Sequence, residues 1–239
     1  MKSFRHLAFF VTMLILPSAS KAQSLFRVIG TVALRDQDKQ RPLKDASQVA
    51  VWLVPTDAAD DTVRSSAYHP ASYQMRQQDK RFEPHLLVVP VGSSVRFPNL
   101  DPWFHNVFSL YRGKRFDLGL YQAGSQKSVQ FDRPGPSYIF CNIHPEMSAV
   151  ILAVNSHYIG VSVSSGNIAI ADVPPGHYRV HFWYEFAADL GAIETRDITV
   201  GQDKANTFGT TTIAVRPSKS THTNKYGQQY DPQSLSPEY

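Results

Sequence analysis

The chain has 239 residues, of which 42% are hydrophobic and 18% are charged, with a formal net charge of +4. Its length exceeds that of one typical domain and is sufficient to bury a real core. Cleavage of residues 1–22, expected below, removes three of the 24 basic residues and no acidic one, which leaves 21 basic residues against 20 acidic ones. A nearly neutral chain gives no electrostatic reason to expect a nucleic-acid partner.

The first 22 residues are typical of a secretory signal peptide. A charged stretch at 1–5 precedes an apolar stretch at 7–16, and small residues at 20–22 form a candidate cleavage site. The apolar stretch is shorter than the roughly 20 residues that a membrane-spanning helix needs. We therefore expect a soluble mature chain, periplasmic or secreted, with no membrane span. A retained membrane anchor is the alternative.

Almost all of the remaining sequence predicts short β-strands. Runs rich in β-branched and aromatic residues alternate with Gly, Pro, Asn and Asp turns, and Tyr178, Val180 and Phe182 alternate as one face of a strand would. No segment sustains a helical period with caps. The pattern predicts an all-β protein built from β-sandwiches. The predicted strands cover residues 26–34, 49–55, 86–91, 94–98, 127–132, 138–141, 149–154, 177–184 and 208–215.

Two polar stretches lack this pattern. Residues 56–66 have the composition of a linker, and residues 216–239 that of a disordered tail, rich in Ser, Thr, Gln and Pro. A docking role for the tyrosines of the tail is the alternative to a solvated tail.

The segments on either side of the chain's centre share a pattern of strands and Pro-Gly turns. The pattern comprises 29–32 (IGTV), 42–46 (PLKDA), 49–53 (VAVWL), 166–170 (GNIAI), 173–180 (VPPGHYRV) and 198–200 (ITV). It resembles carboxypeptidase regulatory-like (transthyretin-like or Ig-like) sandwiches. The resemblance implies a small sandwich made of residues 24–56 and 156–215 and interrupted by an insert at 67–155. Two consecutive domains after a short N-terminal extension are the alternative.

The chain contains a single cysteine, Cys141. A lone cysteine cannot form an internal disulfide, and in an oxidising compartment a free thiol is exposed to oxidation unless something occupies it. Metal coordination would occupy the thiol. Simple burial as a small apolar side chain is the other interpretation.

The residues after Cys141 favour coordination. His144 and Met147 follow at steps of three, which strand geometry alone would not bring together, so the chain must turn after Cys141. Pro145 supports a turn because it cannot continue a strand ladder. A tight loop that directs a thiolate, an imidazole and a thioether to one point forms a soft, mixed-ligand metal site.

His105, 36 residues before Cys141, supplies a second imidazole. Two His, one Cys and a weak axial Met make the arrangement that holds copper for electron transfer, and the thioether argues against zinc. Each of these residues also has a structural interpretation: His105 as a turn residue beside Pro102, and Met147 as core filler.

The central segment resembles the cupredoxins, or blue copper proteins, of the amicyanin and plastocyanin type. The resemblance covers about residues 72–154 and rests on 82–84 (FEP), 91–101 (VGSSVRFPNLD), 105–107 (HNV) and the C-x-x-H-x-x-M loop. It implies a Greek-key β-sandwich with one type 1 copper ion at one end, bound by His105, Cys141, His144 and Met147. It also implies that Asn106 braces the Cys141 loop by a hydrogen bond.

Absent motifs narrow the function further. The sequence has no H-x-H pair, no second cysteine and no H-E-x-x-H or G-x-S-x-G motif. With four protein ligands, copper has no open position for a substrate. We therefore expect an electron carrier and not an enzyme, with a redox protein such as a cytochrome or an oxidoreductase as its partner. One alternative is a copper carrier or sensor. Another is a structural or glycan-binding sandwich protein in which copper only stabilises the fold of the insert.

Overall fold

The computed structural model describes residues 24–57, 72–110, 113–189, 193, 195–216 and 225–226. The predicted signal peptide lies outside these ranges, as do most of the predicted linker and tail. The described residues form eighteen strands and no helix, which confirms the all-β fold class. Within the same ranges, no helix is present that could cross a membrane.

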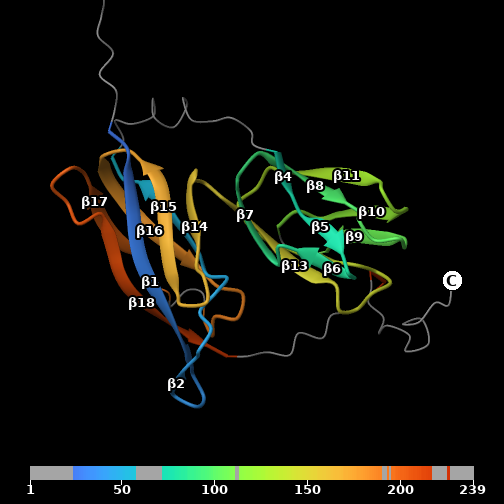
Figure 1. Ribbon diagram of the computed structural model, residues 1–239, viewed down its shortest axis with the longest axis horizontal. Coiled ribbons are helices and arrows are strands. Elements are labelled where there is room, and N and C mark those ends of the chain that lie inside the picture. The colour runs from blue at the N-terminus through green and yellow to red at the C-terminus, as the bar shows by residue number, and fades with distance from the viewer. Residues whose placement is uncertain are drawn as a thin grey trace, which may run out of the picture.

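One group of strands forms a sandwich of two sheets, which we call the terminal sandwich (left in Figure 1). The first sheet has the order β15-β1-β18, with β2 paired to β1: β15 (Asn167–Val173), β1 (Phe26–Asp36), β18 (Thr207–Val215) and β2 (Arg41–Pro42). The second sheet has the order β14-β3-β16-β17: β14 (Tyr158–Val161), β3 (Ala50–Pro55), β16 (Gly176–Trp183) and β17 (Arg196–Val200).

Alternation of side chains creates the core of the terminal sandwich. In β16, Tyr178, Val180 and Phe182 are buried, while the residues between them are exposed or half-buried. The ring of Phe208 packs where a side chain at position 30 would stand, so Gly30 is needed for the close contact between β1 and β18.

The other group of strands, which we call the central sandwich, carries the candidate ligands (right in Figure 1). Its larger sheet has the order β10-β9-β12-β13-β7: β10 (Phe116–Tyr121), β9 (His105–Ser109), β12 (Gly135–Phe140), β13 (Ser148–Val154) and β7 (Leu86–Pro90). The facing sheet has the order β11-β8-β4: β11 (Gln126–Phe131), β8 (Ser93–Pro98) and β4 (Ser72–Gln74). A hairpin adds β5 (Arg76–Gln78) and β6 (Arg81–Glu83).

A third apolar core joins the two sandwiches. Strand β13 is buried on both faces: Ile151 points into the core of the central sandwich, whereas Val150 and Leu152 point out of it. The outward residues pack with Ala50 of β3 and Trp183 of β16. The two sandwiches therefore share a continuous hydrophobic interface, and β13 links this interface to the candidate site.

Strand pairing divides the chain in a particular way. The two sheets of the terminal sandwich use only residues 26–55 and 158–215, and the sheets of the central sandwich use only residues 72–154. Strands β3 and β14 pair with each other although the whole central sandwich lies between them in sequence. That the two sandwiches are separate domains, with the boundaries given above, stays a prediction.

Candidate metal centre

The candidate ligands come from neighbouring strands of one sheet. His105 is the first residue of β9, Cys141 directly follows β12, and Met147 directly precedes β13. The loop that contains Cys141, His144 and Met147 thus connects β12 to its neighbour β13. Its base is closed by a backbone hydrogen bond from Cys141 N–H to the Met147 carbonyl, 3.2 Å, and Met147 N–H donates to the His144 carbonyl, 3.1 Å. These bonds produce the turn that the sequence predicts.

Three donor atoms converge in the interior. The Nδ1 atoms of His105 and His144 lie 3.1 Å apart, and Cys141 Sγ lies 4.0 Å from Nδ1 of His105 and 3.7 Å from Nδ1 of His144. His105 and Cys141 are 0% exposed and His144 is 4% exposed. Among the described residues, the donor atoms of these three side chains lie close enough together to hold one metal ion.

The size of this triangle matches a three-coordinate metal plane. Bond lengths of about 2.0 Å to nitrogen and about 2.3 Å to sulfur in a trigonal plane put the donors about 3.5 to 3.7 Å apart. The observed separations of 3.1, 3.7 and 4.0 Å bracket these values. Two imidazoles and a thiolate are the in-plane ligands of blue-copper sites. The residues present therefore fit a copper ion.

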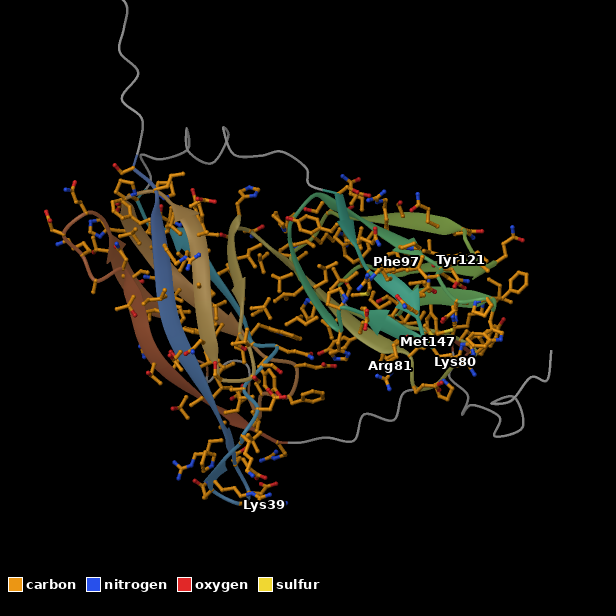
Figure 2. All side chains as sticks on the ribbon, viewed as in Figure 1. Lys39, Lys80, Arg81, Phe97, Tyr121 and Met147 are labelled. Carbon is orange, nitrogen blue, oxygen red and sulfur yellow. The ribbon has the colours of Figure 1, made fainter. Side chains whose placement is uncertain are left out.

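Met147 belongs to the same loop as Cys141 and His144. Its side chain is fully buried in the same hydrophobic core as Cys141, together with Phe97 and Tyr121. Figure 2 labels Met147, Phe97 and Tyr121 in the central sandwich. Its position at the base of the loop, hydrogen-bonded to Cys141, is compatible with an axial ligand, and this role stays a prediction.

A carboxylate that the sequence did not single out orients His105. Nε2–H of His105 donates to Oδ2 of Asp101 at 2.7 Å, and Asp101 is itself buried. Because the carboxylate accepts, the proton of a neutral His105 sits on Nε2 and the lone pair sits on Nδ1, facing Cys141 and His144. Asp101 therefore fixes the tautomer that binds metal.

The β5–β6 hairpin holds Asp101 in place. Its two turn residues, Asp79 and Lys80, both have a φ of 54°, as a tight two-residue turn requires. Their backbone N–H groups donate to Asp101 at 2.7 Å and 3.0 Å. Burial alone would raise the pKa of Asp101, but these bonds and the bond from His105 hold that pKa below its usual value. Asp101 therefore stays ionised as an acceptor.

Burial sets the charge of the ligands. Burial lowers the pKa of His105, and the contact with Asp101 opposes this effect. Burial also lowers the pKa of His144, and the neighbouring His105 lowers it further. Both imidazoles are therefore poised to be neutral, as metal ligands must be. Burial likewise raises the pKa of the Cys141 thiol. A metal ion must then displace the thiol proton when it binds.

Backbone groups partly offset the cost of a buried thiolate. The N–H groups of Asn106, Ile143 and His144 hydrogen-bond to the Cys141 sulfur and lower its pKa against the larger effect of burial. The resemblance implied that Asn106 braces the Cys141 loop. In the structure its backbone N–H makes that contact, while its side-chain amide donates to Asp117 at 2.7 Å.

Sequence reasoning missed the role of Asp101 although the residue lay within a quoted motif. The available signal was its position four residues before His105 and after the strand that ends at Pro98, with Pro102 between them. Asn99 organises this segment, because its side chain bonds to the Trp103 carbonyl at 2.7 Å and to Asp101 N–H at 3.1 Å. Sequence patterns do not reveal such an arrangement.

The segment before His105 also presents apolar side chains to solvent. Leu100, Trp103 and Phe104 are 53%, 40% and 57% exposed. Lys80 Nζ lies 5.1 Å from the centroid of the Trp103 ring. Exposed apolar side chains that adjoin a buried functional site are typical of a surface that contacts another protein.

Among known proteins, the chain is similar to solved structures. No protein-family model and no curated protein sequence matches the chain. A purple cupredoxin from Nitrosopumilus maritimus is similar at 22% identity, with 34% of this chain and 99% of that chain covered and a TM-score of 0.32. A variant of amicyanin in its Cu(I) form is similar at 18% identity, with 37% and 87% covered and a TM-score of 0.33.

A copper-containing nitrite reductase from Thermus scotoductus is also similar, at 22% identity and a TM-score of 0.34. That likeness covers 42% of this chain and only 25% of the reductase chain. The functional proposal below therefore rests on the geometry of this chain's own residues.

Proposed function

We propose that the protein is an exported electron carrier with one type 1 copper ion bound by His105, Cys141, His144 and Met147. The observation that carries the proposal is the buried triangle of one sulfur and two imidazole nitrogens, with sides of 3.1, 3.7 and 4.0 Å. Copper bound there would supply one-electron exchange between Cu(I) and Cu(II). The donor set suits both states, since sulfur ligands favour Cu(I) and imidazoles accept Cu(II).

The surrounding residues restrict movement of these ligands. His105 is held from behind by Asp101, and the Cys141 loop is closed at its base by the bond to Met147. A site whose ligands are already in place needs little rearrangement when the charge on the metal changes. Met147 would hold the copper through its thioether and tune its potential.

The exposed apolar side chains next to the site support a protein partner. His144, the one ligand with some exposure, is the proposed point of electron entry. Leu100, Trp103 and Phe104 supply an apolar surface on the adjoining segment. We propose a redox protein such as a cytochrome or an oxidoreductase as the partner, in the periplasm or outside the cell. We also retain the proposal that the protein is not an enzyme, because four protein ligands would leave the metal no position for a substrate.

Delivery of copper to another protein is the main rival. The donor atoms of His105 and Cys141 are fully buried, which favours retention of the metal over transfer. Repeated reduction by ascorbate and oxidation by ferricyanide, each cycle followed by gel filtration, separates the two functions. An electron carrier keeps one copper per chain through the cycles. Loss of copper to a metal-free acceptor protein within the first cycle would contradict the proposal.

A further inference from the structure

A residue near the C-terminus lies against the candidate metal centre. Strand β18 ends the terminal sandwich at Val215, yet Lys225 contacts the central sandwich. Lys225 Nζ lies 2.9 Å from Oδ2 of Asp117, and its backbone N–H donates to Oδ1 of Asn142 at 3.0 Å. The Lys225 side chain is 25% exposed.

One acceptor lies in the ligand loop, and the other is hydrogen-bonded to the strand that carries His105. Asn142 directly follows Cys141 in the ligand loop. Asp117 of β10 also accepts from the Asn106 amide at 2.7 Å, and Asn106 directly follows His105. Lys225 is therefore connected to the Cys141 sulfur in two ways. One connection runs through Asn142, and the other runs through Asp117 and Asn106, whose backbone N–H bonds to the sulfur.

Electrostatics and packing favour this contact. Burial raises the pKa of Asp117, but bonds from Lys225, Gly119 N–H and Asn106 outweigh it and hold that pKa low. The bond to Asp117 in turn raises the pKa of Lys225. The ammonium also lies 5.3 Å from the ring centroid of Tyr226, a cation–π distance, while the ring stays 70% exposed. The same charged group thus joins Asp117 to an aromatic side chain.

We propose that Asp117 and Asn142 form a docking site for the chain's own C-terminal segment, with Lys225 as the residue that is recognised. Because the segment is covalently attached, its effective concentration is on the order of millimolar, so the two polar contacts to Asp117 and Asn142 are sufficient. If the proposed function holds, Lys225 lies against one side of the ligand loop. A partner that contacts this side must displace it.

Nuclear magnetic resonance on the metal-free, full-length mature chain tests the docking independently of copper. Heteronuclear Overhauser effects report whether the amides of Lys225 and Tyr226 are rigid. In the parent protein we expect values close to those of the strands. In Lys225→Glu these values fall to those of a free chain end, because the glutamate faces Asp117. Lys39→Glu changes charge equally at the β1–β2 hairpin of the terminal sandwich (Figure 2) and leaves them unchanged.

Reversal of the pair strengthens the test. Asp117→Lys alone should also release the segment, and the double variant Asp117→Lys with Lys225→Glu should restore rigidity. Free-chain values in the parent protein, or unchanged values in Lys225→Glu, would overturn the proposal. So would rigidity that disappears on dilution, because that would mean the segment docks on a second copy.

The effect on the metal loop is measured separately. With Cu(I) bound, Lys225→Glu should lose copper to a chelator several-fold faster than the parent and Lys39→Glu. Equal rates in a variant whose segment is released would refute the influence on the metal loop. A chain that binds no copper but shows the expected rigidity refutes the proposed function and leaves the docking intact.

Discussion

At the scale of single residues, the site depends on the direction in which each donor atom points. His105 offers Nδ1 because Asp101 holds the proton on Nε2, and Asp101 can do this because the β5–β6 turn donates to both of its oxygens. Cys141 is deeply buried, yet three backbone N–H groups point at its sulfur. The donors are therefore arranged before any metal binds, and the protein carries the cost of burying them.

Asp101→Asn should weaken copper binding. Lys80 N–H and His105 Nε2–H share Oδ2 of Asp101, whereas Asp79 N–H bonds to Oδ1. The asparagine NH₂ group must oppose one of these two sets, so at least one bond is lost. The uncharged amide oxygen also holds the Nε2–H tautomer of His105 less firmly than the carboxylate does. Loss of such an orienting carboxylate typically lowers metal affinity about 10- to 100-fold. Competition with a chromophoric Cu(I) chelator measures the affinity. Asp132→Asn, which removes a half-exposed ion pair with Lys114, is the matched control. An Asp101→Asn affinity within twofold of the parent would contradict the role of Asp101.

The turn that brings His144 back toward Cys141 was expected from residue types and spacing. Steps of three from Cys141 and the turn at Pro145 indicated that His144 would return toward the sulfur, and the distances bear this out. The approach of His105 depended on the fold, because its partner strand lies far away in sequence. The role of Asp101 depended on a hairpin turn whose backbone donors no side-chain pattern encodes.

At the scale of elements, β13 is the strand that connects site and interface. Its alternate residues enter two different cores, with Ile151 facing the core that contains Cys141 and Leu152 facing the terminal sandwich. Because neighbouring side chains of a strand point to opposite faces, a substitution in β13 affects either the core that contains Cys141 or the interface with the terminal sandwich.

Leu152→Ala and Ile151→Ala should differ in their effects. Each truncation of a buried aliphatic side chain should lower the free energy of unfolding by about 2 to 4 kcal/mol. Urea unfolding of the metal-free protein measures this loss. Only Ile151→Ala should also change the visible spectrum of the copper form, because only its face adjoins the ligands. A spectral change in Leu152→Ala that equals the change in Ile151→Ala would contradict this separation.

Strands could be predicted where apolar and polar residues alternate, as in β8 and β11, or where apolar residues form a continuous run, as in β13. The predicted strands at 94–98, 127–132 and 149–154 agree with β8, β11 and β13 to within one residue at each end. Strand β9 was not predicted as a strand because all five of its residues are buried and include His, Asn and Ser, so it shows no alternation. Strand β10 was missed because it is mostly half-buried or exposed and Gly119 interrupts it with a φ of 66°.

At the scale of the whole molecule, the two sandwiches are joined by apolar packing and, among the residues that the structure describes, by an ion pair. His85 precedes β7 in the central sandwich, and Glu185 follows β16 in the terminal one. His85 Nε2 lies 2.7 Å from Oε2 of Glu185, and Nδ1–H donates to the Ser148 carbonyl at 3.1 Å. The bond to Glu185 raises the pKa of His85 above its ordinary value, with burial opposing it.

Stability should depend on pH through this pair. A histidine whose pKa is raised on folding stabilises the fold fully below its unfolded pKa of about 6.5, and this contribution is lost as pH rises through the folded pKa. Glu185→Gln should therefore lower the free energy of unfolding by about 1 kcal/mol at pH 6 and by less at pH 9. Urea titrations of the metal-free protein at both values measure this. Glu83→Gln, in an exposed pair with Arg76, is the control. A loss that grows with pH would contradict the assignment.

The division of the chain into a split terminal sandwich and a central insert stays a prediction. The pairing of β3 with β14 joins the two stretches of sequence that the resemblance placed together. The third core between the sandwiches was not predicted, because Trp183 and Val150 pack across it from strands that share no local pattern. The resemblance to regulatory-like sandwiches stays a proposal.

The most direct test is to add one equivalent of Cu(II) to the purified mature chain and record its visible absorption and electron paramagnetic resonance spectra. A thiolate bonded in the plane of the two imidazoles predicts an intense charge-transfer band in the visible and a narrow copper hyperfine splitting. Cys141→Ser should lose both. A colourless Cu(II) complex with the wide splitting of an ordinary tetragonal site would show that Cys141, His105 and His144 do not bind copper together.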